Sequence, residues 1–242
     1  MKLSEIYHFL NTLSPFERQE SWDNSGILLG DLEGEISTLY LSLDVDEALV
    51  KGAEENSLII THHPLIFKGL KHFCGGSYPR AFLRELIRKN VALIALHTNY
   101  DLSHLNAYFV REILGFDVFS QEGFLIYVDV NLSFRALCER VKERLHLPFL
   151  RVSDCGKEHL RRIAVCTGSG GDLIPSLREV DCFLSGDFKY HQALEAVSNE
   201  LSLIDLGHYE SEGCFATSLA QNLQNLPLRI IMCVSKNPFQ YF

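Results

Sequence analysis

The chain has 242 residues, of which 47% are hydrophobic and 22% are charged, and its formal net charge at pH 7 is -9. This is the composition of an ordinary globular protein, long enough to bury one large or two modest cores. The negative charge disfavours nucleic acid and anionic membranes as partners. An anionic substrate would therefore need lysines, arginines or a metal ion placed at its site.

The seven cysteines are scattered, and none forms a Cys-x-x-Cys pair, which argues against a zinc ribbon and a thioredoxin-type motif. Most of them lie in apolar runs, so we expect free, buried thiols and a reducing compartment. The N-terminal residues lack the pattern of a signal peptide, and no apolar run approaches the ~20 residues of a membrane span. We therefore expect a cytoplasmic protein without a membrane partner.

Short apolar runs alternate with helical patterns along the chain. The helical patterns cover residues 46–56, 80–89 and 133–146; the first begins with an acidic cap and the second ends in basic residues, as the helix dipole favours. Alternating strands and helices predict an α/β fold with mostly parallel strands. The expected strands are residues 38–43, 57–61, 91–96, 124–130, 149–152, 162–166, 181–184, 201–206 and 228–234.

A repeated strand-loop-helix pattern suggests two related halves. In the first half, one strand is followed by His62-His63 and the next by His97 and Asp101. In the second half, one strand is followed by Gly186-Asp187 and the next by His208 and Glu212. We interpret this repeat as two layered α/β halves, 1–120 and 121–242, with no extra stretch between them; the resemblance described below implies that a large insert domain is absent. A chance likeness between two strand-loop-helix units is the alternative.

Ligands of open α/β sheets gather outside the carboxyl ends of the strands, where these polar residues lie. Neutral imidazoles and carboxylates are ligands of Zn, Fe, Mn or Ni, and the lack of cysteine in these loops argues against a closed structural zinc. Adjacent residues that leave a strand point to different sides, so a dihistidine suits two neighbouring metals better than one. We therefore expect a dinuclear site in the cleft between the halves, held by His62, His63, Asp101, His208 and Glu212.

Each of these residues also has a structural explanation when it is taken alone. Asp101 suits the N-cap of a helix near residues 105–114, and Glu212 suits a solvated helix face. His97 is the candidate catalytic residue, as an orienting group or a general acid/base, but it also suits a hydrogen-bonded core position. Within the dinuclear interpretation, Asp101 or Glu212 would bridge the metals.

Several weaker signals remain. Gly168-Ser-Gly-Gly171 precedes a helical run and could hold a phosphate, but a tight turn is the favoured interpretation. Trp22-Asp-Asn suits a structural or pocket-lining role, and Asp187 could line the same cleft as the dihistidine. Four further side chains are available to a phosphate, although surface exposure explains the lysines as well: Lys68, Lys71, Lys189 and His191.

Motifs spread from residue 22 to residue 212 carry a resemblance to a known family. They are Trp22-Asp-Asn-Ser-Gly26 with Leu29-Gly30, Thr61-His-His-Pro-Leu-Ile-Phe67, His97-Thr-Asn-Tyr-Asp101, Thr167-Gly-Ser-Gly170, Ser185-Gly-Asp-Phe-Lys-Tyr-His191 and Asp205-Leu-Gly-His-Tyr-Glu-Ser-Glu212. In this order they resemble the Nif-three-like proteins, also called the GTP cyclohydrolase I type 2 family. One mild departure from the family pattern is the pair Leu206-Gly207 before His208, where small residues on both sides are common in similar proteins.

The resemblance implies two divalent metal ions held by the same five residues, in a two-domain protein that assembles into a ring-like homohexamer. It also implies GTP cyclohydrolase I activity, in which GTP and water give 7,8-dihydroneopterin triphosphate and formate. Two other functions remain open: a phosphohydrolase acting on a nucleotide or phosphoester, which suits a dinuclear site, and a non-catalytic metal-binding regulatory scaffold. The metal and the guanine-recognising residues are not specified by the sequence.

Overall fold

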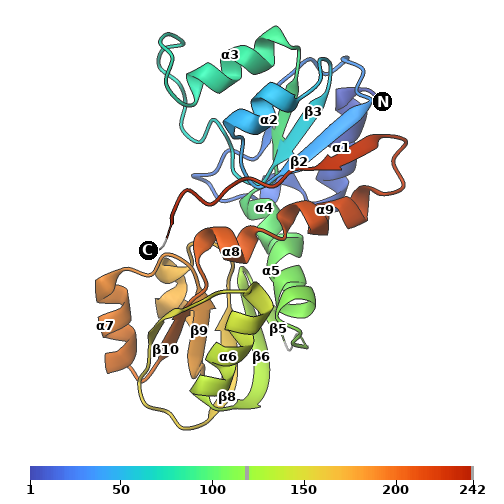
Figure 1. Cartoon of the computed structure of the whole chain (residues 1–242). Coiled ribbons are helices and arrows are strands. Elements are labelled where there is room, and N and C mark those ends of the chain that lie inside the picture. Colours follow the sequence, from blue (N-terminus) through green and yellow to red (C-terminus); the bar gives the residue numbers. More distant parts are fainter. Residues whose placement is uncertain (118–119, 241–242) are drawn as a thin grey trace. The chain divides into compact units, whose positions relative to one another are not determined.

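The computed structural model describes residues 1–117 and 120–240, which divide into two compact units (Figure 1). Unit 1 comprises Met1–Ser103 together with the chain from Phe215 onward, and unit 2 comprises His104–Cys214. These boundaries differ from the expected halves, 1–120 and 121–242, because the C-terminal segment returns to the first sheet. There β11 (Arg229–Met232) pairs in parallel with β2 (Thr38–Ser42).

Unit 1 contains a five-stranded sheet in the order β1-β4-β3-β2-β11. The central strands β3 (Leu58–Thr61) and β4 (Ala92–Ala95) are parallel to β2, and β1 (Gly26–Leu29) lies antiparallel at the edge beside β4. Every residue of β2, β3 and β4 is buried, as is typical of parallel strands covered on both faces. Because both faces of the sheet are covered, polar side chains of a site can gather only at the ends of its strands.

The helices of unit 1 follow from local capping and apolar spacing. In α2 (Glu47–Gly52), the Asp46 carboxylate accepts a hydrogen bond from the Leu49 amide at 2.8 Å, which caps the first turn. Buried side chains of α2 and of α3 (Arg80–Arg88) pack on one face of the sheet, against Ile59 and its neighbours. The remaining elements of this unit are α1 (Leu3–Leu13), η1 (Phe16–Arg18) and α9 (Phe215–Leu223).

Unit 2 contains a six-stranded mixed sheet in the order β5-β6-β8-β9-β10-β7. Its inner strands β8, β9 and β10 are parallel, whereas β5, β6 and β7 pair antiparallel with their neighbours. The bounds of these strands are β5 Ser120–Glu122, β6 Leu125–Leu132, β7 Arg151–Ser153, β8 Leu160–Val165, β9 Cys182–Ser185 and β10 Ser202–Asp205. The parallel inner strands again bring several carboxyl ends to one edge.

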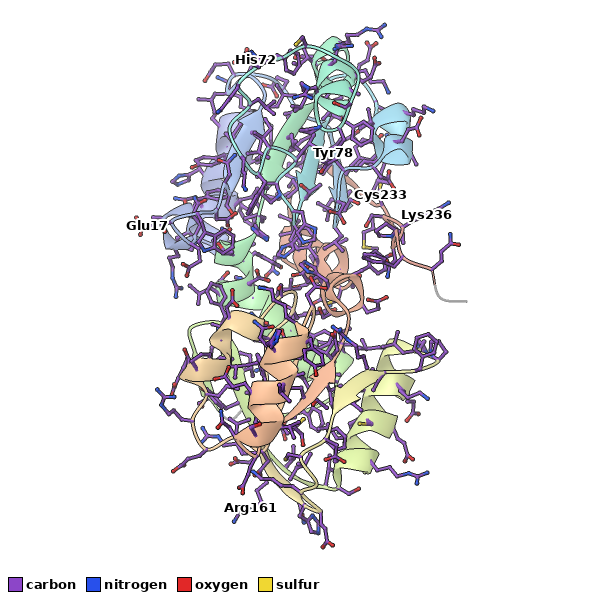
Figure 2. All side chains as sticks on the ribbon, turned by 90° about the vertical axis from the view of Figure 1, so that its left-hand side faces the viewer. Glu17, His72, Tyr78, Arg161, Cys233 and Lys236 are labelled. Carbon is purple, nitrogen blue, oxygen red and sulfur yellow. The ribbon has the colours of Figure 1, made fainter. Side chains whose placement is uncertain are left out.

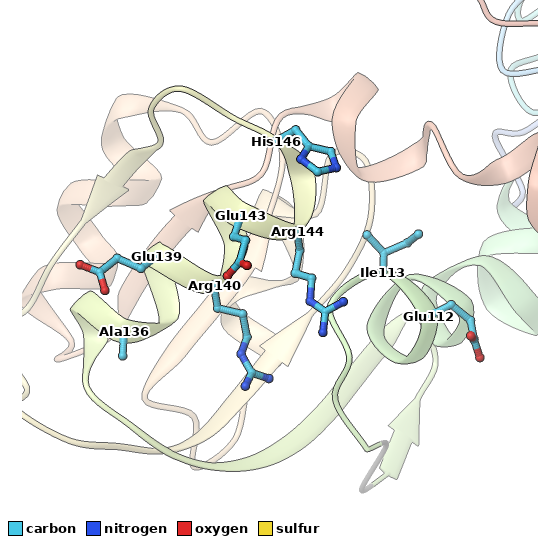
Figure 3. A pocket seen from close by; sticks show the side chains of 8 residues that line it. All are labelled: Glu112, Ile113, Ala136, Glu139, Arg140, Glu143, Arg144 and His146. Carbon is cyan, nitrogen blue, oxygen red and sulfur yellow. The ribbon is translucent and has the colours of Figure 1, made fainter.

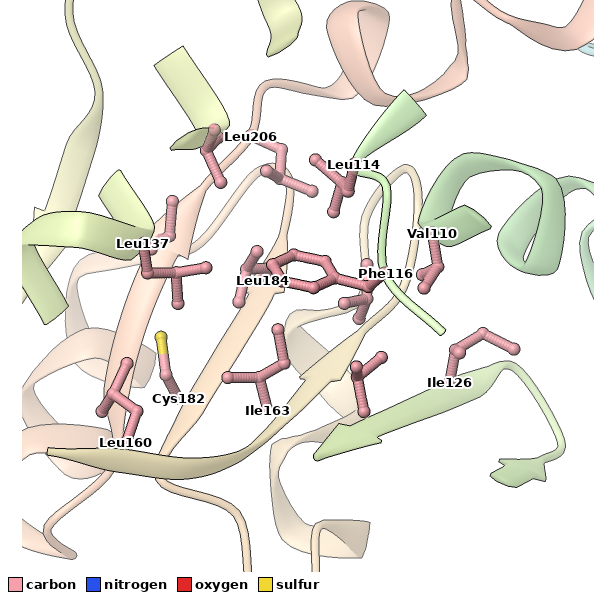
Figure 4. Close-up of a cluster of buried hydrophobic side chains, with 14 of the residues drawn as sticks. Val110, Leu114, Phe116, Ile126, Leu137, Leu160, Ile163, Cys182, Leu184 and Leu206 are labelled. Carbon is pink, nitrogen blue, oxygen red and sulfur yellow. The ribbon is translucent and has the colours of Figure 1, made fainter. Parts of the chain in front are cut away.

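One hydrophobic core of unit 2 is formed by the sheet, α6 (Phe134–Leu145) and residues 109–116 (Figure 4). Leu137 of the helix, Ile163 of β8 and Leu184 of β9 are fully buried in it. The Ser133 hydroxyl caps α6 by accepting a hydrogen bond from the Ala136 amide at 3.2 Å. The other helices are η4 (Gly171–Ser176), α7 (Tyr190–Ser198) and α8 (His208–Glu212).

One helical run spans the boundary between the units along the chain. It consists of α4 (Thr98–Tyr100), η2 (Asp101–Leu105), α5 (Asn106–Tyr108) and η3 (Phe109–Ile113), and η2 and η3 are π-helical. Asp101 thus lies inside the run, and it is His97 that precedes the first helical residue. The N-cap explanation of Asp101 is therefore wrong. π-Helical turns recur at functional sites because they redirect side chains.

All nine expected strands and the three expected helices are confirmed, with ends shifted by a few residues. Two strands were not expected. β1 is short and begins at Gly26, whose φ is +123°, and β5 has the polar sequence Ser-Gln-Glu. β5 has no apolar pattern, and the apolar run of β1 is only three residues long between Gly26 and Gly30. Both strands lie at sheet edges, where such sequences are tolerated.

The expectations for cysteines and membrane spans have different outcomes. All seven cysteines are free, but only Cys166 and Cys182 are buried, and Cys74 is exposed. The other four are partly exposed, so the expectation of general burial is wrong. It fails most clearly for Cys74, which lies on the long loop between β3 and α3, the loop that also carries His72 and Tyr78 (Figure 2). Among the described residues, no helix has the length and apolarity needed to cross a membrane.

Candidate metal centre

In unit 1, the carboxyl ends of neighbouring parallel strands bring histidines together. His62 and His63 directly follow β3, and His97 follows β4 by two residues. The ring centroids are 5.0 Å apart for His62 and His63, 5.1 Å for His62 and His97, and 5.6 Å for His63 and His97. Each ring offers a nitrogen within 4.8 Å of those of the other two. These three residues and Asp101 are called the histidine cluster below.

Every ring of this cluster has its Nδ1 atom held by an oxygen. The Nδ1–H group donates to the Leu96 carbonyl in His62 and to the Asp44 carboxylate in His63, both at 2.8 Å. In His97 it donates to the Asp23 carboxylate at 2.7 Å. An oxygen acceptor fixes the proton on Nδ1, so the Nε2 lone pair remains for a cation or a proton.

Asp101 supplies a carboxylate beside the buried His62 ring. Its amide donates to the His97 carbonyl at 3.0 Å, and its Oδ1 atom lies 3.5 Å from Nε2 of His62. His62 is fully buried, and only 9% of the Asp101 surface is exposed. Burying these polar groups is costly unless they are satisfied by partners or by a metal ion. The pair therefore has the character of a ligand site.

Asp23 of unit 1 has a carboxylate with several hydrogen-bond partners, and its side chain is fully buried. Besides the bond from His97, it accepts hydrogen bonds from the Ser25 hydroxyl at 3.0 Å and from the amide and hydroxyl of Thr98. Burial would raise the pKa of Asp23, but the hydrogen bond from His97, the charge of that ring when it is protonated, and the bond from Thr98 together outweigh burial. The pKa therefore lies well below its ordinary value, and Asp23 is an anion that orients His97.

Unit 2 contains a second, smaller group of ligand-type side chains at the ends of β9 and β10. His208 and Glu212 are the first and last residues of α8, so they share a helix face. The His208 Nδ1–H donates to the Asp187 carboxylate at 2.7 Å, and its Nε2 lies 3.1 Å from Oε2 of Glu212. The Glu212 side chain is only 3% exposed. This pair repeats the arrangement of unit 1, with an oriented imidazole beside a buried carboxylate.

Glycine makes room for Glu212. Gly168, with φ of +64°, follows β8, and a Cβ atom built on it would lie 2.1 Å from Oε1 of Glu212. Its amide also donates to the Ser211 hydroxyl at 3.0 Å. The segment from Gly168 to Gly170 is irregular backbone that leads into η4 at Gly171, and its first residue packs against α8. The lack of a side chain at Gly168 leaves room for the carboxylate of Glu212.

A pocket of about 610 Å³ in unit 2 is separate from these residues (Figure 3). Acidic and basic side chains from η3, α6 and the residue after α6 face it together, so it has no dominant charge that would select an anion or a cation. Its lining contains none of the expected ligands and consists of Glu112, Ile113, Ala136, Glu139, Arg140, Glu143, Arg144 and His146.

The structure thus places the expected site residues in two groups. His62, His63, His97 and Asp101 lie together in unit 1, and His208 and Glu212 lie together in unit 2. Among the carboxylates that orient the rings, sequence reasoning missed Asp44 and gave Asp23 and Asp187 only a structural or cleft-lining role. Asp44 and Asp187 follow strand ends as the histidines do, and this was a usable signal. Lys68, Lys71, Lys189 and His191 are exposed.

The donor set fits a divalent cation of the borderline class. The three expected imidazole ligands have Nδ1 held by an oxygen, as does the neighbouring His97, and two largely buried carboxylates lie beside them. Carboxylate–histidine pairs of this kind orient the ligands of Zn, Fe, Mn and Ni sites and increase the basicity of the ligating nitrogen. The residues present therefore fit the metal that the sequence motifs imply.

The chain matches one protein family and similar proteins of other bacteria over nearly its whole length. The profile of the Duf34/NIF3 family (NGG1p interacting factor 3) matches residues 1–238. A Campylobacter jejuni protein named GTP cyclohydrolase 1 type 2 homolog is 68% identical over 242 residues, covering 100% of both chains. A Helicobacter pylori protein named GTP cyclohydrolase 1 type 2 is 41% identical over 241 residues, covering 98% of both.

Two solved structures are similar over nearly the whole chain. A Staphylococcus aureus protein superposes with a TM-score of 0.89 at 24% identity, covering 100% of this chain and 99% of that one. Reduced HcgD from Methanocaldococcus jannaschii gives a TM-score of 0.81 at 26% identity, covering 96% and 97%. The α/β fold of the two units is therefore shared with these proteins.

Replacing Asp44 by Asn tests whether the orienting carboxylates matter for metal binding. The amide of the new side chain can still accept from His63, but it carries no charge to increase the basicity of the ring. We expect the affinity for Zn²⁺ to fall about 10–100-fold, as is typical when an orienting partner is changed. Competition with a chromophoric chelator measures it.

Asp31→Asn is the matched control, because Asp31 is an exposed aspartate of the same unit whose side chain bonds only the Glu33 amide among the described residues. It should leave Zn²⁺ affinity unchanged. Equal affinity in the Asp44 variant and the control would contradict the role of Asp44.

Replacing Gly168 by Ala tests the packing of Glu212. The new Cβ atom would overlap Oε1 of Glu212, so the carboxylate has to move and metal retention should fall. Gly123→Ala is the control, because Gly123 has a similar φ of +58° and nothing within 4 Å of its Cβ position. Both changes carry the left-handed backbone cost of about 1–2 kcal/mol, which urea unfolding measures. Metal retention equal in the two variants would show that Glu212 does not depend on Gly168.

Proposed function

The chain belongs to the Duf34/NIF3 family, and on that premise we propose that it is a dinuclear metal-dependent hydrolase that acts on a nucleotide, with GTP as its substrate. The observation that carries the proposal is the set of four histidines whose Nδ1 atoms are held by oxygen acceptors next to buried carboxylates. The proposal retains the homohexameric assembly and the cytoplasmic location expected from the sequence.

In the proposed site, five side chains hold two divalent cations: His62, His63, Asp101, His208 and Glu212. The two carboxylates support this assignment because anionic ligands between or beside two neighbouring cations offset the repulsion between them. Bound cations of this class supply Lewis acidity and lower the pKa of water toward ~7. The protein contributes oriented ligands, so little reorganisation accompanies binding.

His97 is proposed to transfer the proton. Asp23 accepts from its Nδ1–H, so the neutral ring presents an Nε2 lone pair that can take a proton from water. The nearby carboxylate then stabilises the imidazolium, which can return the proton to the departing group. The ring is 14% exposed, so it is partly reachable from solvent.

The nucleotide substrate is supported by the names of the relatives. The Helicobacter pylori relative, 41% identical, is called GTP cyclohydrolase 1 type 2, and its match covers 98% of both chains. The proposed reaction consumes GTP and water and yields 7,8-dihydroneopterin triphosphate and formate. Local metal ions would also compensate for the net charge of -9, which otherwise repels a nucleotide.

Metal content measured by elemental analysis tests the shared site. We expect about two metal ions per wild-type chain and a clear loss in both His62→Ala and Glu212→Gln, because each variant removes a ligand of the same pair. The control is Glu210→Gln, which changes a glutamate of α8 two residues from Glu212. A Glu212→Gln variant that retains the wild-type metal content would show that unit 1 binds the metals alone.

Formate release from GTP tests the reaction. Metal-loaded protein should release one formate per GTP, and chelator-treated protein should release none until metal is restored. In His97→Gln, metal content should persist while kcat falls about 10²–10⁴-fold, the usual contribution of a general acid/base. Phosphate release in place of formate would indicate a phosphohydrolase, and no product in any metal-loaded sample would indicate a non-catalytic protein.

A further inference from the structure

Two exposed aromatic rings flank His97 at the edge of the histidine cluster. Trp22 is 57% exposed and Phe67 is 43% exposed. The Trp22 centroid lies 6.1 Å from His97 and 5.9 Å from Phe67, and the Phe67 centroid lies 6.3 Å from His97. All three residues belong to unit 1. Large apolar side chains grouped beside a polar site are typical of ligand-binding surfaces.

The loop that carries Trp22 is held firmly although the ring is exposed. The Gln19 side chain accepts from the Ser25 amide at 2.7 Å and donates to the Ser25 carbonyl at 3.3 Å, which closes the loop. Asp23, the next residue after Trp22, is fixed by its bonds to His97 and Thr98. The exposure of Trp22 is therefore a built feature of an ordered loop.

The loop that carries Phe67 is tied to the same segment. The Asn24 side-chain amide donates to the Ile66 carbonyl at 2.5 Å, so the segments that carry Trp22 and Phe67 are directly bonded. The two rings are inclined at 56° and are not stacked on each other. The plane of each ring is nearly perpendicular to that of His97, at 76° for Trp22 and 81° for Phe67. Because about half of each aromatic residue is exposed, each ring keeps surface that a flat ligand can contact.

We propose that Trp22 and Phe67 form an aromatic platform on which the purine base of the substrate stacks, beside His97 and the metal ligands. The proposal rests on the proposed function and names the residues that would hold the base. A planar base suits such a platform because aromatic stacking needs only a π face. Stacking contributes affinity and position but little discrimination among bases, so the platform places the purine ring next to the groups that act on it.

Tryptophan fluorescence gives a direct test, because Trp22 is the single tryptophan of the chain. The metal-loaded protein is titrated with guanosine, GTP and inorganic triphosphate, with N-acetyltryptophanamide as the standard for inner-filter and collisional effects. Guanosine and GTP should quench Trp22 saturably beyond the standard, and triphosphate should not. Quenching no greater than in the standard, or equal quenching by triphosphate, would overturn the platform. Poor quenching by acrylamide before ligand addition would also overturn it, because the ring would then be buried in an assembly.

Variants test the energetic role of the two rings. GTP affinity is measured by equilibrium dialysis with radiolabelled nucleotide, which does not depend on the fluorophore. Trp22→Ala and Phe67→Ala should each weaken GTP binding about tenfold or more, and Trp22→Phe should restore most of the affinity, because stacking needs an aromatic face. Tyr190→Ala is the control, since Tyr190 is 74% exposed in unit 2. Metal content and melting temperature should match the wild type in all four proteins.

The outcomes separate this inference from the proposed reaction. Formate release by the wild type, together with unchanged GTP affinity in both alanine variants, would overturn the platform and leave the hydrolase intact. Saturable quenching by guanosine and weakened binding in the variants, without formate release by the wild type, would support the platform and overturn the proposed reaction.

Discussion

The candidate site depends on one recurring interaction, the hydrogen bond from a histidine Nδ1–H to an oxygen at the end of a neighbouring strand. The acceptor is the Leu96 carbonyl for His62, the Asp44 carboxylate for His63 and the Asp187 carboxylate for His208. Each bond fixes both the tautomer and the direction of the ring. Without such a partner, an imidazole at a strand end could rotate, and a preorganised set of Nε2 atoms would not exist.

Parallel pairing explains why these acceptors are in reach. In unit 1, β2, β3 and β4 run in register, with Ser42 opposite Thr61 and Thr61 opposite Ala95, so the residues just beyond them emerge side by side. Their apolar bodies are buried by helices on both faces, which leaves the ends as the place where polar groups can gather. A buried His62 and a largely buried Asp101 are tolerated there because the charges and dipoles of the cluster compensate one another.

Much of this arrangement was predictable from the sequence. The dihistidine after an apolar run, and the repeated spacing of His97 to Asp101 and of His208 to Glu212, indicated strand ends and ligand chemistry. The partners of the rings were harder to predict, because which carboxylate reaches which ring depends on strand register and loop geometry. Asp23 lies 74 residues from His97 along the chain, and no local pattern relates the two.

The return of the C-terminal segment escaped prediction for a related reason. An apolar run identifies β11 as a strand, but the partner it selects depends on which sheet edge is free, which is a property of the whole fold. Its register with β2, from Arg229 opposite Thr38 to Met232 opposite Leu41, completes the sheet of unit 1. Symmetry between two halves is therefore a good guide to the inner strands and a poor guide to the edges.

The loop from Gln19 to Ser25 carries both a residue that orients His97 and a ring of the proposed base platform. Its Asp23 carboxylate sets the orientation of His97, while the adjacent Trp22 carries the ring of the proposed base platform. Because the two residues are neighbours in one hydrogen-bonded loop, the indole is held at a fixed place relative to the carboxylate that orients His97. A base stacked on Trp22 would therefore be positioned relative to the proton-transferring ring by the same loop. Holding the reacting groups in a defined geometry before the reaction lowers its barrier, so the loop would contribute to catalysis by orientation.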